Sequence, residues 1–270
     1  GTDTVVIFGK SWDFQVKEII KTSLQENLAM IKETCAYLKE QGRRVFYDAE
    51  HFFTAYEQNK EYALKTIEAA VEGGAKVICL CETKGGFMID QCRAAVAEVV
   101  KTFGSRVEIG IHTHNDCGLA VANSLVAVSE GAEQVQGVLL GFGERTGNAN
   151  LSTIIPDLQL KMGYECIPPE NMKKLTAICN QVAEITNISM NQQSPYVGKS
   201  AFAHKAGMHI DAVLKNPFAY EHIEPESVGN TRAAAAVQHG GYPHSTNTGS
   251  APCKLPVATA QQKIKGTSKN

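Results

Sequence analysis

The 270-residue sequence lacks several features that would place it in a specialised class of protein. No uninterrupted apolar stretch is long enough to cross a bilayer, which argues against a membrane-spanning protein. The net charge is -2 and the pI about 6.5, with no basic stripe to bind nucleic acid and no acidic run typical of a disordered tail. The 43% hydrophobic and 20% charged residues indicate an ordinary soluble protein with one large core.

No C-x-x-C pair occurs among the eight cysteines, which lie at positions 35, 79, 81, 92, 117, 166, 179 and 253. Disulfide frameworks are typical of small secreted domains, so we interpret these cysteines as reduced thiols that act as small buried hydrophobes. We therefore expect a cytoplasmic protein. An initiator Met and a signal-peptide charge pattern are also missing, and a buried strand is predicted as early as 5–8, so we expect the sequence to start within a domain.

Apolar periodicity predicts five strands that alternate with helices. The predicted strands are 5–8, 44–48, 77–81, 107–112 and 134–140, and the predicted helices are 14–41, 60–72, 89–103 and a segment that ends at 130. Repeats of roughly 30 residues imply parallel strands joined by crossover helices. An open doubly wound sheet and a (β/α)8 barrel both fit this α/β pattern, and both place chemistry at the carboxyl ends of the strands.

The sequence after the fifth predicted strand changes character twice. Residues 150–190 are predicted to form further helices, and the residues after Arg232 have no sustained period and are rich in Ser, Thr, Gly and Pro. We therefore expect an α/β domain at 1–165, a helical segment at 166–232, and a disordered or non-homologous tail at 233–270.

Two histidines, His112 and His114, stand one residue apart at the end of the fourth predicted strand. Residues two apart on a strand share a face, so both imidazoles can bind one ion such as Zn, Mn, Co or Fe, with an oxygen ligand completing the set. The alternative is a pair of strand-end histidines that form hydrogen bonds with neighbouring loops.

Other motifs also have a chemical and a structural interpretation. The glycine-rich segment 141–150 could cradle an anion but lacks the G-K-[ST] of a Walker loop, and it fits a simple strand-to-helix turn as well. Asp48 and Glu50 could bind a substrate hydroxyl or act as a general base, or they could form a solvated acidic loop. His204 and His209 lie near a predicted helix, where a packing role is the common one.

Taken together, "GIHTHNDCGLAVANS", "GERTGNANL" and "AFAHKAGMHIDAVLK" resemble the family of 2-isopropylmalate, homocitrate and citramalate synthases. "VVIFGKSWD", "FYDAEHFF" and "LCETKGG" resemble the citramalate synthase branch more closely. The resemblance runs from about residue 4 to about residue 232. It implies that residues 1–165 form a catalytic domain of the TIM-barrel type and that residues 166–232 contribute to its active site. The five predicted strands match the family's fourth to eighth, so the expected fold is a partial (β/α)8 barrel that lacks its first three strands, followed by a helical linker segment.

The resemblance also implies the residues of an active site. A divalent metal (Zn, Mn, Mg or Co) is the implied cofactor, and the family's fourth metal ligand, an Asp of an early Arg-Asp motif, has no counterpart here. The implied metal ligands are His112, His114 and Asn148, the catalytic residues are Glu50, His209 and Tyr220, and the substrate contacts are Asp48, Thr83, Gly141 and Gly143.

Four positions depart from the family pattern. Glu82 and Lys84 stand where the branch has Asp and Asn, and Lys84 is expected to place a positive charge near the metal. Val138 and Leu140 stand where the family has Thr and Asn, which removes polar groups from a strand expected to face the site. Because three strands with further site residues are also missing, we expect this chain by itself to be inactive.

The implied activity is the condensation of acetyl-CoA, as co-substrate, with a 2-oxo acid, foremost pyruvate to give citramalate, in isoleucine and leucine biosynthesis. Three alternatives stay open: a 2-isopropylmalate or homocitrate synthase, a metal-dependent lyase that splits a hydroxyacyl-CoA, and a non-catalytic relic whose surface serves assembly. The expected partners are small-molecule substrates, without nucleic acid or membrane. Full-length members of the family are expected to be homodimers.

Overall fold

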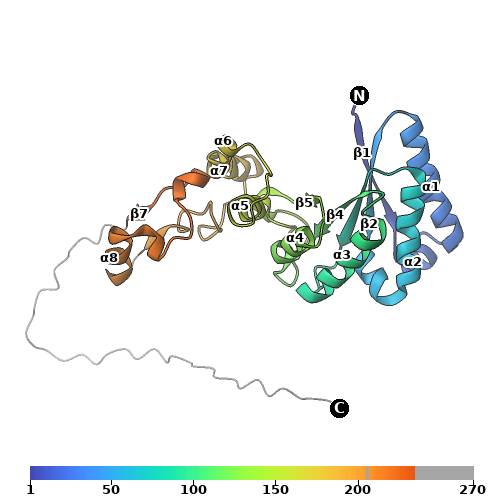
Figure 1. Ribbon diagram of the computed structural model, residues 1–270, viewed down its shortest axis with the longest axis horizontal. Helices are drawn as coiled ribbons and strands as arrows, with labels where there is room; N and C mark the ends of the chain where they lie inside the picture. Colours follow the sequence, from blue (N-terminus) through green and yellow to red (C-terminus); the bar gives the residue numbers. More distant parts are fainter. Residues whose placement is uncertain (205–206, 235–270) are drawn as a thin grey trace, which may run out of the picture. The chain divides into compact units, whose positions relative to one another are not determined.

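Five parallel strands form one sheet in the order β1-β2-β3-β4-β5 (Figure 1). The computed structural model describes residues 1–204 and 207–234, so most of the predicted tail lies outside the described residues. Each strand pairs with the next strand along the chain, which confirms the predicted parallel α/β fold. The strands are β1 (Thr4–Lys10), β2 (Arg44–Glu50), β3 (Val77–Glu82), β4 (Glu108–Thr113) and β5 (Gln134–Gln136).

Helices join the strands and continue beyond the sheet. The crossover helices are α1 (Leu24–Glu40), α2 (Phe52–Gly73), α3 (Ile89–Phe103) and α4 (Ala120–Ser129). After β5 follow α5 (Leu151–Pro156), α6 (Pro169–Met172), α7 (Leu175–Thr186) and α8 (Gly207–Lys215), with β6 (Ala203–His204) and β7 (Ala233–Ala234) forming a small second sheet. Single 3-10 turns lie at Leu139–Gly141, Pro217–Ala219 and Pro225–Val228, and π-helical turns at Gln15–Ile19 and Asp157–Lys161. Across the described ranges, no helix offers the length and hydropathy that a bilayer crossing requires.

Three predicted elements have the wrong extent for local reasons. Helix α2 begins at Phe52, well before the predicted 60–72, and the non-helical backbone of Asn59 (φ -150°, ψ 71°) lies just before the predicted start. The predicted helix 14–41 is divided, because Ser23 caps a separate α1 and its side-chain oxygen accepts the backbone N–H of Glu26 at 3.0 Å. The predicted strand 134–140 ends after three residues. Leu140 has a φ of 65°, a left-handed conformation that turns the chain out of the sheet.

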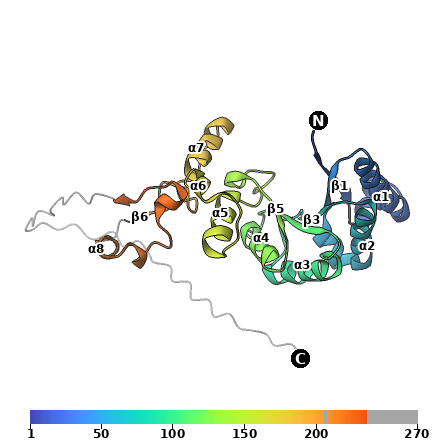
Figure 2. The ribbon, with the colours of Figure 1, turned by 45° about the horizontal axis from the view of Figure 1, so that its top comes forward.

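Among residues 1–204 and 207–234, helices cover only one face of the five-stranded sheet (Figure 2). Strand side chains alternate between faces, and Tyr47, Leu80 and Ile111 point toward the helices, where each is at most 1% exposed. On the opposite face of β1, Val6 is 52% and Phe8 is 70% exposed. A doubly wound sheet carries helices on both faces, so the single layer favours the barrel over that alternative.

A hydrogen bond between strands that are not neighbours indicates that the sheet curls. The side-chain Nε2 of Gln136 in β5 donates to Oδ1 of Asp48 in β2 at 2.8 Å. These strands are three strand spacings apart, roughly 14 Å in a flat sheet, which is farther than the two side chains reach. The sheet must therefore curl toward its open face, as barrel strands do. The partial-barrel prediction is in agreement with this geometry.

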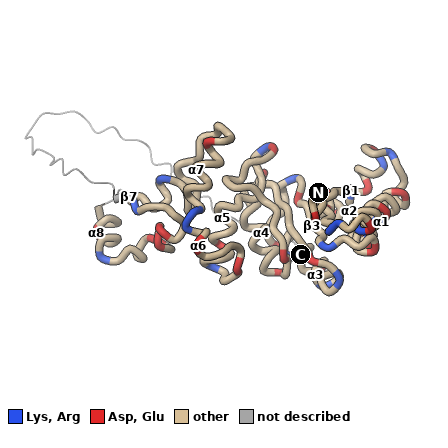
Figure 3. Tube along the Cα trace, turned by 90° about the horizontal axis from the view of Figure 1, so that it is seen from above, with Lys and Arg blue, Asp and Glu red and all other residues tan. Residues whose placement is uncertain are grey.

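Basic and acidic residues are interspersed along the helices that cover the sheet (Figure 3). Lys32 of α1 pairs with Glu72 of α2 at 2.7 Å, and Lys60 of α2 pairs with Glu98 of α3 at 2.8 Å. Exposed pairs of this kind contribute at most about 1 kcal/mol each. The apolar core between the sheet and its helices therefore contributes most of the stability of this layer.

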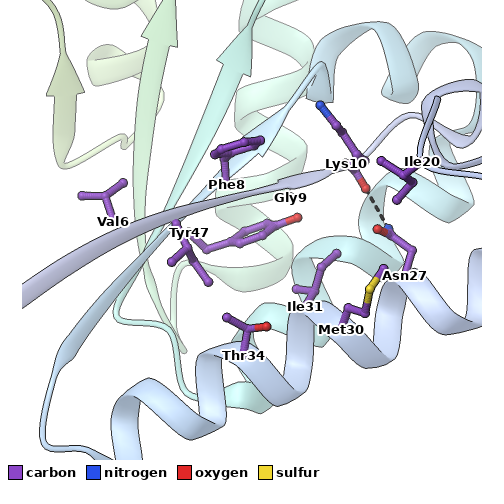
Figure 4. A pocket seen from close by; sticks show the side chains of 11 residues that line it. Val6, Phe8, Gly9, Lys10, Ile20, Asn27, Met30, Ile31, Thr34 and Tyr47 are labelled. Carbon is purple, nitrogen blue, oxygen red and sulfur yellow. Dashed lines mark hydrogen bonds between the residues drawn. The ribbon is translucent and has the colours of Figure 1, made fainter.

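A groove of about 500 Å³ lies between β1 and α1 (Figure 4). The ring of Tyr47 passes beneath β1 at this point, and a Cβ on Gly9 would lie only 2.6 Å from its hydroxyl oxygen. A glycine is therefore needed for the strand to approach the ring. At one end of the groove, Asn27 Nδ2 donates to the backbone oxygen of Lys10 at 2.9 Å, which ties α1 to β1.

The one-sided core predicts a contrast between two phenylalanines. Phe52, fully buried between sheet and helices, should destabilise the protein by about 3–5 kcal/mol when changed to Ala, because the change removes buried area and leaves a cavity. Phe8→Ala, on the open face, should change stability by less than about 0.5 kcal/mol. Urea denaturation of both variants measures this difference, and equal losses would contradict the assignment of the faces.

Candidate active site

A pocket of about 300 Å³ opens on the uncovered face of the sheet, at the carboxyl ends of the strands. It brings together five of the residues singled out from the sequence, which come from β2, β3, β4 and the turns that follow them. The residues that line it are Phe8, Asp48, Glu50, Cys81, Thr83, His112, His114 and Glu144. Barrels of this type place their chemistry at this end of the strands.

The imidazoles of His112 and His114 point toward each other across the pocket. Their Nε2 atoms are 3.3 Å apart, and the ring centroids are 5.1 Å apart. Two nitrogens bound at about 2.1 Å to one tetrahedral ion lie roughly 3.4 Å apart, so the observed spacing suits a shared ion. Burial lowers the pKa of His114, which favours the neutral imidazole that a metal requires.

Asn148 pairs with His114 through an isolated antiparallel β-bridge. In the described part of the chain, its side-chain Oδ1 is buried without a hydrogen-bond partner. Buried polar atoms without partners are rare in proteins, and a bound ion or ligand is one explanation for them. In residues 1–204 and 207–234, no three His, Cys, Asp or Glu side chains group as a metal site, so an amide oxygen is the third ligand that these residues can offer. Two imidazoles and an amide oxygen fit a divalent ion.

Two glycines of the loop after β5 fix the position of Asn148. A Cβ on Gly143 would lie 2.6 Å from Nδ2 of Asn148, and the backbone N–H of Asn148 donates to the carbonyl of Gly141 at 3.0 Å. The two glycines predicted to approach acetyl-CoA therefore lie against the predicted amide ligand.

Glu50 is held at the edge of the pocket by an ion pair with Lys10. The two residues are register partners on β2 and β1, so their side chains leave the same face of the sheet. Both side chains are largely buried, with 26% and 18% of their surface exposed, which limits the directions in which the carboxylate can turn. The Lys10–Glu50 ion pair thus holds a carboxylate in the same pocket as the two histidines, and this carboxylate is carried by a strand and not by a flexible loop.

Thr83 begins the turn after β3, and hydrogen bonds fix it on two sides. Its hydroxyl oxygen accepts the backbone N–H of His51 at 2.9 Å, so its hydroxyl hydrogen remains available to donate to a ligand. Its carbonyl accepts from Arg145 at 2.8 Å, and Arg145 also forms a two-point ion pair with Asp116. The turns after β2, β3, β4 and β5 are thereby tied together around the pocket.

Gln136 is a site residue that the sequence did not single out. It lies directly opposite His112 in the β4–β5 register, and its Oε1 is 3.1 Å from Nδ1 of His112 while its Nε2 donates to Asp48. Burial raises the pKa of Asp48, and the Gln136 hydrogen bond opposes that rise. A polar residue opposite a candidate ligand in a parallel register is the signal that could have identified it.

None of the four positions that depart from the family pattern is among the residues that line the pocket. Glu82 points to the helical side, where it is 1% exposed and accepts the N–H of Gly86, and burial raises its pKa. Lys84 extends over the ring of Trp12, 4.6 Å from its centroid, and is not among the lining residues. Leu140 packs against an apolar cluster formed by residues 172–228, not toward the pocket.

His209 and Tyr220 lie together in the segment after the sheet, with ring centroids 4.2 Å apart. The adjacent Glu221 is buried and binds both His204 and Arg232, which anchors this segment. Neither His209 nor Tyr220 is among the residues that line the pocket. Their predicted catalytic roles stay predictions.

Two family models match the chain. The HMGL-like model matches residues 1–182, and the model described as homocitrate synthase post-HMGL domain-like matches residues 196–261. The second match extends into residues for which a non-homologous tail is predicted.

Curated relatives agree with the resemblance drawn from the motifs. The chain is 55% identical to an (R)-citramalate synthase of Aquifex aeolicus over 231 residues, which cover 86% of the chain and 44% of the relative. It is 50% identical to the (R)-citramalate synthase of Synechocystis over 247 residues, covering 89% of the chain and 45% of the relative. A 2-isopropylmalate synthase of Sulfolobus acidocaldarius is 34% identical, covering 89% of the chain and 61% of the relative. The chain thus spans less than half the length of the citramalate synthases it matches.

Solved structures agree on the fold. The HMG-CoA lyase of Bacillus subtilis superposes with a TM-score of 0.59 at 20% identity, covering 70% of this chain and 65% of the lyase. With a family model that matches more than half of its length, the chain belongs to the HMGL-like family, and within it the chain shares more identity with these two citramalate synthases than with this 2-isopropylmalate synthase.

Proposed function

We propose that this chain carries part of the active site of an acyltransferase that condenses acetyl-CoA with pyruvate to form citramalate, a step of branched-chain amino-acid biosynthesis. The observation that carries the proposal is the pocket in which Asp48, Glu50, Thr83 and both histidines meet at the carboxyl ends of the strands. The identity of about half of the residues with curated citramalate synthases supports pyruvate as the 2-oxo acid.

His112, His114 and Asn148 would hold a divalent metal, which when bound supplies Lewis-acid polarisation of the oxo-acid carbonyl. The carboxylate of Glu50, which is ion-paired with Lys10, lines the same pocket. There it would accept the proton that leaves the methyl group of acetyl-CoA. The new carbon–carbon bond forms between that methyl carbon and the carbonyl carbon of pyruvate. Water then hydrolyses the thioester and releases CoA.

Two further side chains can position the oxo acid. The hydroxyl of Thr83 already accepts a backbone N–H, so it can donate its own hydrogen to a carboxylate oxygen of the substrate. Asp48 accepts a hydrogen bond from the amide of Gln136 on one oxygen, which leaves its second oxygen to accept from the hydroxyl that the oxo-acid carbonyl becomes in citramalate. We also propose that residues 166–232 bring His209 and Tyr220 to the reaction.

The lyase alternative has weaker support than the synthase. Its solved relatives are at most 20% identical to this chain, and likeness at that level reports the fold alone. The synthases are matched at 46–55% identity. A shared barrel therefore does not favour bond cleavage here.

The metal proposal predicts a loss of Co²⁺ binding in His112→Ala. The affinity of the 270-residue chain for Co²⁺ should fall more than about 100-fold. Loss of a residue that only hydrogen-bonds to a metal ligand costs about 10–100-fold in affinity, and loss of the ligand itself should cost more. Calorimetry and the visible absorption of bound Co²⁺ measure this affinity. The exposed His222 serves as the control, and His222→Ala should bind Co²⁺ as the unaltered chain does. Unchanged binding in His112→Ala would rule out these ligands.

The packing of Gly143 on Asn148 predicts that Gly143→Ala weakens Co²⁺ binding by about 10-fold, because the added Cβ displaces the amide ligand. Gly86→Ala is the matched control, since a Cβ there meets nothing within 4 Å. Calorimetric titration of both variants tests this. Equal affinities for the two alanine variants would contradict a ligand role for Asn148.

The activity itself is tested in a chimera. Residues 4–232 of this chain replace the matching segment of the Aquifex aeolicus relative, and release of CoA from acetyl-CoA is followed with pyruvate and with bulkier 2-oxo acids. The chimera should prefer pyruvate, and Glu50→Gln should lower kcat by about 100- to 10,000-fold because a proton-transferring group is lost.

The exposed Glu61 provides the control for that substitution, and Glu61→Gln should leave kcat unchanged. A folded chimera that prefers a bulkier 2-oxo acid would contradict the proposed substrate. Full activity of the Glu50→Gln chimera would contradict the role given to this carboxylate.

A further inference from the structure

The amide of Gln136 bridges a candidate metal ligand and a candidate substrate contact. Its Oε1 lies 3.1 Å from Nδ1 of His112, and its Nε2 lies 2.8 Å from Oδ1 of Asp48. The register places Gln136 directly opposite His112 on the same face of the sheet, and the curl of the sheet brings Asp48 within reach. Two strands on opposite sides of the pocket are thus connected through one side chain.

The chemistry of the partners fixes which way this amide points. An ionised carboxylate only accepts hydrogen bonds, so Asp48 must face the NH2 group of Gln136. The carbonyl oxygen of Gln136 therefore faces His112, and because an amide oxygen also only accepts, Nδ1 of His112 must carry the hydrogen. A neutral imidazole has one such hydrogen, so Nε2 of His112 keeps its lone pair toward His114 and the pocket.

We propose that Gln136 is a positioning residue that selects the Nδ1–H tautomer of His112 and fixes its ring for metal binding. This inference rests on the proposed metal site. Metal-binding histidines usually donate their second N–H to an acceptor that sets the tautomer and raises affinity, and Gln136 is the acceptor that His112 finds. His114 has no comparable anchor, because its Nδ1 is buried without a partner in the described part of the chain. The fixed orientation of the two imidazole rings therefore depends on His112.

The tautomer is measured on the metal-free, ¹⁵N-labelled 270-residue chain by long-range ¹H–¹⁵N correlation, with the His112 signals assigned by their loss in His112→Ala. The unaltered chain should give the Nδ1–H form. Gln136→Met keeps the length of the side chain but removes the acceptor, so the His112 signals should shift toward the Nε2–H form. Affinity for Co²⁺ should fall 10- to 100-fold in the same variant.

Two variants make the test specific. Gln134→Met removes the amide two residues earlier on the same face of β5, away from His112, and should change neither readout. The double variant Asp48→Asn with Gln136→Glu exchanges donor and acceptor while conserving charge. The amide introduced on β2 would be the donor and the carboxylate introduced on β5 would accept from His112, so the Nδ1–H form and Co²⁺ affinity within about threefold of the unaltered chain are expected.

Each outcome decides a different claim. A Gln136→Met chain that keeps the Nδ1–H form and binds Co²⁺ as before overturns the role of Gln136. If Gln136→Met does not fold, the exchanged pair decides, and loss of the Nδ1–H form in that folded variant overturns the inference. If the unaltered chain binds no Co²⁺, the metal site of the proposed function fails, while the tautomer in the metal-free chain still tests Gln136.

Discussion

The curl of a parallel sheet covered by helices on one face is the constraint on which the site depends. Curling brings the inner-face side chains of strands that are not neighbours within hydrogen-bond distance, as the bond from Gln136 to Asp48 demonstrates. The outer face of the same strands packs against α1 to α4 and supplies the rigidity. Residues that alternate along one strand therefore serve two purposes, with Ile111 in the core and His112 in the pocket.

A buried polar atom of Asn148, which forms a β-bridge with the pocket-lining His114, is not satisfied by the described residues. Its Oδ1 has no hydrogen-bond partner there, and leaving such a group unpaired costs about 1–3 kcal/mol. Cores avoid that cost, whereas binding sites accept it because a ligand later supplies the missing partner. The glycines beside Asn148 and the ion pair of Glu50 hold the surrounding groups in place for such a ligand.

Local sequence rules predicted the features that depend on neighbouring residues. Period-two alternation placed His112 and His114 on one face, and the strand–helix repeat gave the parallel sheet. The division of the predicted helix 14–41 depends on the cap at Ser23, and the early end of β5 depends on the left-handed backbone of Leu140. The spacing of apolar residues over a long window does not detect such single-residue effects. Asn148 came from the family resemblance, and Gln136 required the register between β4 and β5, because contacts across a curled sheet are not encoded in spacing along the chain.

The central claim is that one ion can be shared by two imidazoles and an amide on the inner face of this sheet. A crystal structure of the 270-residue chain grown with Zn²⁺, with anomalous differences measured at the zinc edge, tests it most directly. The account predicts one peak within about 2.3 Å of Nε2 of His112, Nε2 of His114 and Oδ1 of Asn148. A peak bound elsewhere, or rings of His112 and His114 that turn away from each other, would contradict it.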